Sequence, residues 1–543
     1  MTSRLAACAL LGSFVFAAVT AARPPPAPPK LVVLIVIDQL RYDYLTRFDD
    51  LFQGGFRRLL DEGAVFTNAK FRHAITLTSP GHATIATGRH PSRHGVTANY
   101  RYDPEYGKRV NAVFDPAEKA VGGKGSTSSP RILEAPTLAD SLKTQRAGSQ
   151  AVGVSLKDRS AILLAGKKAD GAYWISADCG CLVSSSYYHD RAPRWLEAFN
   201  ARKLADSYFG EVWKPFLEDR SLYEKYSRAD DFPGESDGRE PSFPHPLRGS
   251  PPDPAFYEGV MDSALGDEIV LNAALAAMDG RQLGGDDIPD LLAISFAGVD
   301  RVGHIFGPFS QEAMDQILRL DYVLGRLLDE LDEQVGLDQT VIALTADHGV
   351  LPLVEHLRQE GKHAVRFPKS LIPDAVNDAI NEKHLRAGNV VAYFDPPHIF
   401  FDLKRLAELG ISRTAAEDPA SQAIVATGYV EKVYRHSDFA AKSAPGDAFF
   451  PLYRNSFHAA RSPHLIVQLK QNHYVDGSQG STGHGSPYDY DRHVPIVFFG
   501  KGISKGRFEK PAGPEDVAPT LAKILEIEMA PDPDSRLLDE ALR

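Results

Sequence analysis

The stretch L31-V-V-L-I-V-I37, followed at once by Asp38, decides the fold. It is an unbroken run of aliphatic, mostly β-branched residues, and its length suits a strand that is buried on both faces. Strands of this kind occur in parallel sheets that helices cover on both sides. The run therefore predicts an α/β fold, and it puts a carboxylate directly at the end of a strand.

Further apolar runs have the same character, and helical patterns lie between some of them. We interpret the following runs as buried parallel strands: 151–154, 291–296, 340–345 and 494–499. A helical pattern covers residues 311–331, and another lies at about 262–278. Strands that alternate with helices predict an α/β, three-layer αβα sandwich with a mostly parallel central sheet.

The N-terminus has the features of a secretory signal peptide. One arginine precedes an apolar run and an alanine-rich end, so we expect residues 1–22 to be cleaved and the protein to be periplasmic or secreted. The alternative is a membrane anchor, but the apolar run 5–19 is short for a span, so no stable span should remain after cleavage. Residues 23–30 are proline-rich and predict an extended linker.

The remaining chain, 31–543, is expected to be one catalytic domain with insertions. Three stretches contain more proline, glycine, tyrosine and charge than the strand-and-helix segments, at about 101–135, 200–260 and 350–480. We predict that they form a cap over one end of the sheet. Export leaves Cys179 and Cys181, in D-C-G-C between two strand-like runs. This pattern predicts a hairpin turn, and an oxidising compartment makes a small disulfide possible there.

The charge balance limits the partners of the protein. The formal net charge is −11, while hydrophobic content of 43% and charged content of 24% are ordinary for a globular chain. A duplex nucleic-acid binder needs a basic face, so we exclude that class. Small phosphorylated substrates remain possible because they need only a few local cations. We also expect a monomer.

Acidic and imidazole side chains occur beside the predicted strands. Ligands bind beyond the carboxyl ends of the strands in open α/β sheets, and the residues near these positions are Asp38, Asp300, His304, Asp347, His348 and His484. A single Asp after a strand is more often a turn or a helix cap. The indication of a site comes from finding the whole set beside strands of one predicted sheet.

These residues divide into two sets of zinc ligands. Aspartate and histidine bind zinc, and three protein ligands leave a coordination position open for water or substrate. One set is Asp38, Asp347 and His348, and the other is Asp300, His304 and His484. Two metal ions close together can hold the attacking and leaving oxygens of an in-line displacement, which suits phosphoryl transfer.

The segment T76-L-T-S-P-G-H82 supplies hydroxyl groups before a predicted short helix that spans residues 82–88. Backbone N–H groups at a helix start face an anion, and metal coordination can turn a hydroxyl into an alkoxide nucleophile. The residues alone leave open whether the nucleophile is Thr76, Thr78, Ser79 or Thr84. They also leave open whether Thr78 or Ser79 only caps the helix.

Taken as an ordered set, the motifs resemble a known family from about Lys30 to about Pro531. The motifs are I-D38-Q-L-R-Y-D-Y-L, T78-S-P-G-H-A-T-I-A-T-G, H94-G-V-T-A-N99, D300-x-x-x-H304, A-D347-H348-G and H484-G-S-P-Y-D-Y-D-R-H-V-P-I. They resemble the alkaline phosphatase superfamily. The most similar branch is the bacterial secreted alkaline phosphatases with a threonine nucleophile, which are related to the nucleotide pyrophosphatase/phosphodiesterases.

The resemblance assigns roles to the site residues. It implies that Thr78 is the nucleophile and also binds the zinc held by Asp38, Asp347 and His348. A second zinc would lie on Asp300, His304 and His484, which gives two Zn²⁺ per chain. It implies that Asn99, Lys157 and Arg159 bind the substrate phosphate. The lysine fills the place of a third metal in the family, so no dedicated Mg²⁺ is expected.

The cation pair favours one activity over its neighbours. Arginine can hold two phosphate oxygens and lysine adds a point charge, which suits the dianion of a phosphate monoester. The sequence therefore predicts a zinc-dependent alkaline phosphatase that acts through a covalent phosphothreonine and releases phosphate and an alcohol. The alternative is a phosphodiesterase/nucleotide pyrophosphatase on the same scaffold. A sulfatase would need a C/S-x-P-x-R motif, which T78-S-P-G-H lacks, and a binding protein without catalysis would not need all six ligands.

Overall fold

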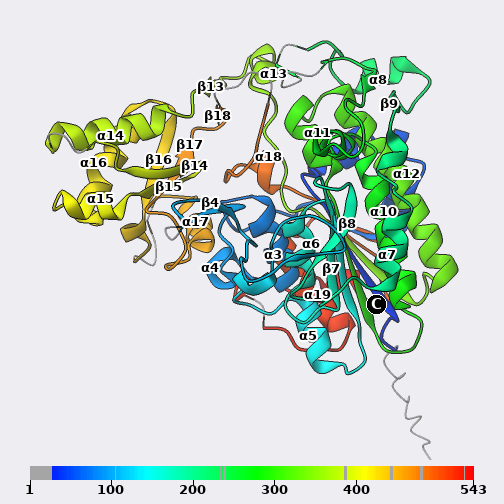
Figure 1. Ribbon diagram of the computed structural model, residues 1–543. Helices are drawn as coiled ribbons and strands as arrows, with labels where there is room; N and C mark the ends of the chain where they lie inside the picture. The colour runs from blue at the N-terminus through cyan, green and yellow to red at the C-terminus, as the bar shows by residue number, and fades with distance from the viewer. Residues whose placement is uncertain are drawn as a thin grey trace, which may run out of the picture.

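The computed structural model describes residues 27–543 except 104–105, 233, 236–239, 385–387, 441–443, 445, 477–480 and 531 (Figure 1). The predicted signal peptide, 1–22, and the first part of the linker lie outside the described residues. In the part of the chain that is described, no helix combines the length and apolarity that a membrane crossing requires.

A ten-stranded sheet forms the centre of the larger lobe. Its strand order is β20 (Gly506–Phe508), β2 (Ala64–Phe66), β19 (Ile496–Gly500), β12 (Thr340–Thr345), β1 (Leu31–Ile37), β11 (Asp290–Phe296), β6 (Ala151–Ser155), β7 (Gly171–Ser176), β8 (Cys181–Ser185) and β5 (Ala120–Val121). The strand β1 lies in the middle, parallel to both β12 and β11. Every residue of β1 is buried, as its unbroken apolar sequence predicts.

The predicted strand at 494–499 is β19, but its predicted direction is wrong. This strand is antiparallel to β12, with Ile496 opposite Thr345 and Gly500 opposite Val341. An apolar run gives the burial of a strand and not its direction, which depends on the path of the preceding chain. The reversal matters because residues that precede β19 now lie at the edge where β1 and β12 end.

Helices cover both faces of the sheet and confirm the predicted three-layer sandwich. One layer contains α2 (Gly55–Glu62), α7 (Arg194–Ala201), α10 (Gly266–Arg281) and α12 (Gln311–Gln334). The other contains α3 (Thr78–Thr87), α5 (Leu138–Gln145), α6 (Asp158–Ala165) and α19 (Val517–Ile524). Figure 1 shows α10 and α12 on the right of the sheet and α3 and α6 on the left. The two helices expected from periodicity are α10 and α12.

The helix α3 begins earlier than the sequence predicts. It starts at Thr78 instead of residue 82 and ends at Thr87, and Gly88 is the C-cap residue with φ 63°. Pro80 fits inside the first turn because the first N–H groups of a helix have no intrahelical acceptor. Leu77 is the N-cap residue and makes no side-chain cap, so the interpretation of Thr78 or Ser79 as a capping residue is wrong.

A second lobe, on the left in Figure 1, has its own antiparallel sheet and core. Its strand order is β14 (Val391–Asp395), β15 (His398–Phe401), β17 (Leu465–Leu469) and β16 (Val430–Arg435). The helices α14 (Leu371–Lys383) and α16 (Arg413–Ala426) pack together beside it. A hairpin of β3 (Tyr100–Asp103) and β4 (Lys108–Asn111) reaches this lobe, where Tyr102 stacks on Tyr393.

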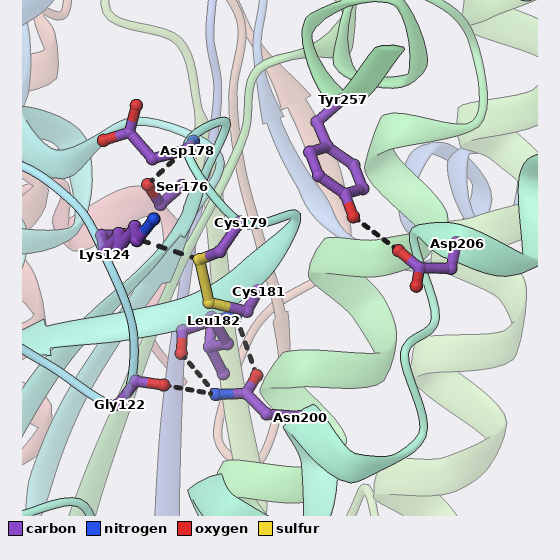
Figure 2. Close-up of a disulfide and its surroundings, with 10 residues drawn as sticks. All are labelled: Gly122, Lys124, Ser176, Asp178, Cys179, Cys181, Leu182, Asn200, Asp206 and Tyr257. Atoms are coloured by element: carbon purple, nitrogen blue, oxygen red, sulfur yellow. Dashed lines mark hydrogen bonds between the residues drawn. A yellow bond between two sulfur atoms is a disulfide. The ribbon is translucent and has the colours of Figure 1, made fainter. Parts of the chain in front are cut away.

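The turn between β7 and β8 is the predicted hairpin, and it contains a disulfide between Cys179 and Cys181 (Figure 2). Gly180 has φ 59° and lies against Tyr257, whose ring would be 2.2 Å from an added Cβ. The Tyr257 hydroxyl donates to Asp206 Oδ1 at 2.6 Å. The disulfide turn is therefore packed against the segment that precedes α10.

The packing of α12 gives a test of the core. Leu324 is 1% exposed and faces α2, whereas Tyr322 on the same helix is 53% exposed. Leu324→Ala should lower the free energy of unfolding by about 2–5 kcal/mol because it leaves a cavity. Tyr322→Ala should change it by less than about 0.5 kcal/mol. Denaturant titration of both variants measures the difference, and equal effects would contradict the packing described.

Candidate active site

The predicted ligands meet at one edge of the sheet because several strands end or begin there. Asp38 follows β1, Asp347 and His348 follow β12, Asp300 and His304 lie on α11 (Gly298–Phe306) after β11, and His484 precedes β19. All of these side chains are buried except that of His304, which is 38% exposed. The antiparallel direction of β19 is what brings His484 to this edge.

Asp38, Asp347 and His348 come together as predicted. His348 Nε2 lies 3.3 Å from Asp38 Oδ1 and 3.5 Å from Asp347 Oδ2. One ligand atom from each of the three residues lies within 4.8 Å of the others. This spacing suits a single cation held between two carboxylates and an imidazole.

In the second predicted set, His304 and His484 both contact Asp300, and His348 lies beside His484. Asp300 Oδ1 lies 3.1 Å from His304 Nε2 and 3.7 Å from His484 Nε2. The rings of His348 and His484 stack with centroids 3.5 Å apart. One ligand atom from each of Asp300, His348 and His484 lies within 4.8 Å of the others, a group that contains His348 in place of the predicted His304. His304 joins it through Asp300, and His348 lies between the two sets.

The imidazoles share a hydrogen-bonding pattern that suits metal ligands. In each ring Nδ1 faces a backbone carbonyl: His304 with Thr482 at 2.7 Å, His484 with Thr76 at 2.8 Å, and His348 with Gly349 at 2.9 Å. Donation from Nδ1–H fixes the tautomer and leaves the Nε2 lone pair available. All three Nε2 atoms contact the carboxylate cluster.

The carboxylates carry more negative charge than the protein neutralises. Lys157 Nζ lies 2.6 Å from Asp38 Oδ2 and also pairs with Asp300. Burial and the charges of Asp300 and Asp347 raise the pKa of Asp38 to about 8. Asp38 Oδ1 is buried and accepts no hydrogen bond from the residues described. The donor set thus fits divalent cations, which would supply the missing charge.

Among the candidate nucleophiles, Thr78 is the hydroxyl that faces this cluster. Its Oγ1 lies 3.4 Å from His348 Nε2. Thr76 donates to the Ser486 carbonyl at 3.0 Å, and Thr84 contacts His94 at 3.1 Å. Those two hydroxyls are therefore engaged elsewhere. The Ser79 hydroxyl is buried and has no hydrogen bond to the described residues, so the contact with His348 distinguishes Thr78 from the other three candidates.

The remaining predicted residues lie around Thr78. Asn99 Oδ1 accepts a hydrogen bond of 2.7 Å from the Ser79 amide, so Asn99 is tied to the first turn of α3. Lys157 is the N-cap residue of α6, and Arg159 lies in its first turn. Among the described residues, the Nε of the Arg159 guanidinium is buried without a hydrogen bond. It is available to an anionic ligand.

A cleft of about 450 Å³ opens beside these groups. Asn99, Arg159, His304 and His484 form one part of its lining. Residues of the second lobe and of its neighbouring strands form the rest, and they include Lys369, Asp395, Val467 and Tyr474. The cleft thus runs from the carboxylate cluster to the second lobe.

Gln39 contacts the site but has no recognisable signature in the sequence. Its backbone N–H donates to Asp347, and its side chain donates to Asp300. The sequence puts it after Asp38, but nothing in that position reveals a contact with residues that are distant in the chain. His82, which the motif places near the site, lies 3.0 Å from Asp347 Oδ2 through its Nδ1.

A sequence model of the type I phosphodiesterase / nucleotide pyrophosphatase family matches residues 32–493. The chain belongs to this family. The family match and the similar proteins described below both confirm the predicted resemblance to the alkaline phosphatase superfamily.

Curated relatives of the family cover almost the whole chain. Alkaline phosphatase PafA of Elizabethkingia meningoseptica is 32% identical over 518 residues, which are 92% of each protein. Alkaline phosphatase PhoK of Sphingomonas sp. is 33% identical over 532 residues, covering 94% of this chain and 90% of PhoK.

Solved structures agree with the fold. The crystal structure of wild-type PafA superposes with a TM-score of 0.88 at 31% identity, over 96% of this chain and all of that one. Murine ectonucleotide pyrophosphatase/phosphodiesterase 5 gives a TM-score of 0.52 at 14% identity and shows likeness of fold alone.

The close approach of α3 to Asp347 gives a test of the site. A Cβ on Gly81 would lie 2.5 Å from the Asp347 carbonyl oxygen and 2.7 Å from its Cβ. Gly81→Ala must therefore displace Asp347, and it should lower the free energy of unfolding by about 1–3 kcal/mol and reduce bound metal.

Gly259 in α9 (Pro254–Met261) is a matched control, since an added Cβ there meets nothing within 4 Å. Gly259→Ala should keep full metal content and raise stability by about 0.5–1 kcal/mol. Metal analysis and thermal unfolding of both variants check this. A Gly81→Ala protein with unchanged metal content would contradict the described contact.

Proposed function

We propose that this chain is a zinc-dependent alkaline phosphatase that hydrolyses phosphate monoesters through a covalent phosphothreonine intermediate. The observation that carries the proposal is the position of Thr78 Oγ1, 3.4 Å from His348 Nε2, at a buried cluster of carboxylates and imidazoles. The relatives named alkaline phosphatases, at about 30% identity over most of the chain, support the same enzyme class.

Two zinc ions are the cofactors that the donor set favours. Asp38, Asp347 and His348 would hold one ion together with Thr78 Oγ1, and Asp300, His304 and His484 would hold the other. Oxygen and imidazole-nitrogen donors, three from each set, match zinc sites that keep an open position. When bound, zinc lowers the pKa of a coordinated hydroxyl or water and stabilises charge on oxygen.

The residues of the chain then perform a double displacement. Thr78 Oγ1 loses its proton and attacks phosphorus in line, forming a Thr78–phosphate ester while the P–O bond to the alcohol breaks. The leaving oxygen gains a proton and departs as the alcohol. Water then attacks phosphorus and the P–Oγ1 bond breaks, which releases inorganic phosphate and restores the hydroxyl. Because neither displacement needs large covalent rearrangement of the protein, positioning and charge stabilisation supply most of the catalysis.

Three residues would hold the phosphate during both displacements. The Asn99 side-chain amide nitrogen can donate, since its oxygen is occupied by the Ser79 amide. Arg159 lines the cleft, and its guanidinium Nε has no hydrogen bond to the described residues, which suits two phosphate oxygens at once. Lys157 is placed between Asp38 and Asp300 and adds positive charge there. With an ammonium in this position, we propose that the site has no dedicated Mg²⁺.

The surroundings of the cleft support further parts of the proposal. We propose that the insertions at about 101–135 and 350–480 act as a cap, because residues of both contribute to the cleft lining. For 200–260 the cap stays a prediction, because none of the described residues that line the cleft comes from it. The substrates would be small phosphorylated molecules, and the protein a periplasmic or secreted monomer. The expected leader supports export, and the limited size of the cleft supports small substrates. The monomeric state stays a prediction.

A phosphodiesterase is the second candidate, because the family description names that activity. A diester carries one negative charge fewer than a monoester dianion and has a second ester group to accommodate. Arg159 and Lys157 together favour the dianion. Substitution of Arg159 should therefore slow monoester hydrolysis more than diester hydrolysis if the enzyme is a phosphomonoesterase.

Removing the nucleophile tests the proposed chemistry. Thr78→Ala should lower monoester hydrolysis by several orders of magnitude, about 10³-fold or more, because the covalent path is lost. Thr78→Ser should keep part of the rate, since it restores a hydroxyl. Assays with and without a chelator measure this, and acid quenching followed by peptide mass analysis locates the phosphate. Full activity of Thr78→Ala, or of chelated wild type, would refute the mechanism.

Removing the guanidinium tests the substrate class. Arg159→Ala should lower kcat/KM for a phosphate monoester by about 10- to 100-fold, the effect expected for lost hydrogen bonds to a charged group. Hydrolysis of the matching methyl diester should fall less.

The matched control is Arg146→Ala, because Arg146 contacts Glu526 at 3.5 Å and is absent from the cleft lining. It should leave both rates unchanged. A wild-type enzyme that prefers the diester, or an Arg159→Ala variant that loses both activities equally, would favour the phosphodiesterase.

A further inference from the structure

Gln39 lies between the two predicted ligand sets in an unusual backbone conformation. It follows Asp38, is completely buried, and has φ 69°, a left-handed value that residues other than glycine rarely adopt. Such conformations persist where the surrounding contacts determine them, and they are frequent at functional sites. The contacts of Gln39 explain why the chain adopts it here.

The two ends of Gln39 bind carboxylates from different sets. The backbone N–H donates to Asp347 Oδ1 at 3.1 Å, and the side-chain Nε2 donates to Asp300 Oδ1 at 2.8 Å. Asp347 belongs to the Thr78 side of the site and Asp300 to the His304 side. A single residue is thus hydrogen-bonded to one ligand of each predicted metal.

The orientation of the carboxamide is fixed by its neighbours. Gln39 Oε1 points at Gly303 of α11, where an added Cβ would lie only 1.9 Å away. If the carboxamide were rotated by half a turn, Gln39 Oε1 would face the Asp300 carboxylate, and the oxygens would repel each other. Because Gly303 has no side chain, there is space for the Gln39 carboxamide, and its Nε2 can reach Asp300. Asp300 lies one helical turn before the ligand His304 on α11.

We propose that Gln39 is a positioning residue that sets the geometry of the two metal sites relative to each other. Its backbone holds Asp347 while its side chain holds Asp300, so one residue links the two carboxylates and restrains the distance between them. Catalysis by two metals depends on that separation, because both ions must reach the same phosphate. The proposal rests on the proposed two-metal function.

Gln39→Met tests this role, since it keeps side-chain length and the backbone N–H bond to Asp347 but removes the donor to Asp300. We expect one of two zinc equivalents to be released to a chelator about 10- to 100-fold faster, the usual effect of losing a hydrogen bond to a ligand. The second equivalent should be released at the wild-type rate. Gln39→Gly, which adopts φ 69° without strain, should behave as Gln39→Met does.

The matched control is Gln150→Met, which removes the side-chain hydrogen bond from Gln150 to the Arg281 carbonyl at 2.7 Å, at the end of β6 opposite to the site. It should leave both zinc release rates unchanged. The proposal is overturned if the Gln39 variants release both equivalents as wild type does, or if Gln150→Met accelerates release equally. Failure of the proposed function is a separate outcome, seen as fewer than two zinc equivalents in wild type.

Discussion

Three carboxylates buried side by side are the constraint on which the rest of the structure depends. Asp38, Asp300 and Asp347 are at most 4% exposed, and burial together with the other two carboxylates raises the pKa of Asp38. Burial opposes ionisation of Asp300 and Asp347 too, but the charge of Lys157 lowers the pKa of Asp300 and His348 lowers that of Asp347. The ammonium of Lys157 pairs with two of them. Unpaired buried charge costs several kcal/mol per ion, on the order of the stability of a whole domain. A fold keeps such a cluster where cations complete it, which is the basis of the two-zinc proposal.

The sheet brings the cluster together because neighbouring parallel strands end at one edge. Asp38 and Asp347 follow adjacent strands, β1 and β12, and Asp300 lies on the helix after β11. The reversed strand β19 contributes His484 from its opposite end. The order of the strands thus brings together ligands from distant segments of the chain. Because the strands are hydrogen-bonded in one sheet, the ligands can move little relative to one another.

Much of this arrangement could be predicted from the sequence. Unbroken apolar runs indicate buried strands, and the candidate Asp and His ligands near all of these runs except 151–154 indicate a site at the carboxyl edge. The direction of β19 could not be predicted, because burial is the same for parallel and antiparallel strands. The start of α3 was missed because Ser79, Pro80 and Gly81 have the composition of a turn, although a first helical turn tolerates them. Gln39 was missed because its partners, Asp347 and Asp300, are far away in the sequence.

The central claim is that two zinc ions complete this carboxylate cluster beside Thr78. Anomalous diffraction at the zinc edge from crystals of the protein as purified tests it most directly. The account predicts two peaks, one among Asp38, Asp347, His348 and Thr78 Oγ1, and one among Asp300, His304 and His484. A single peak, or none with Lys157 as the only cation among the carboxylates, would contradict it.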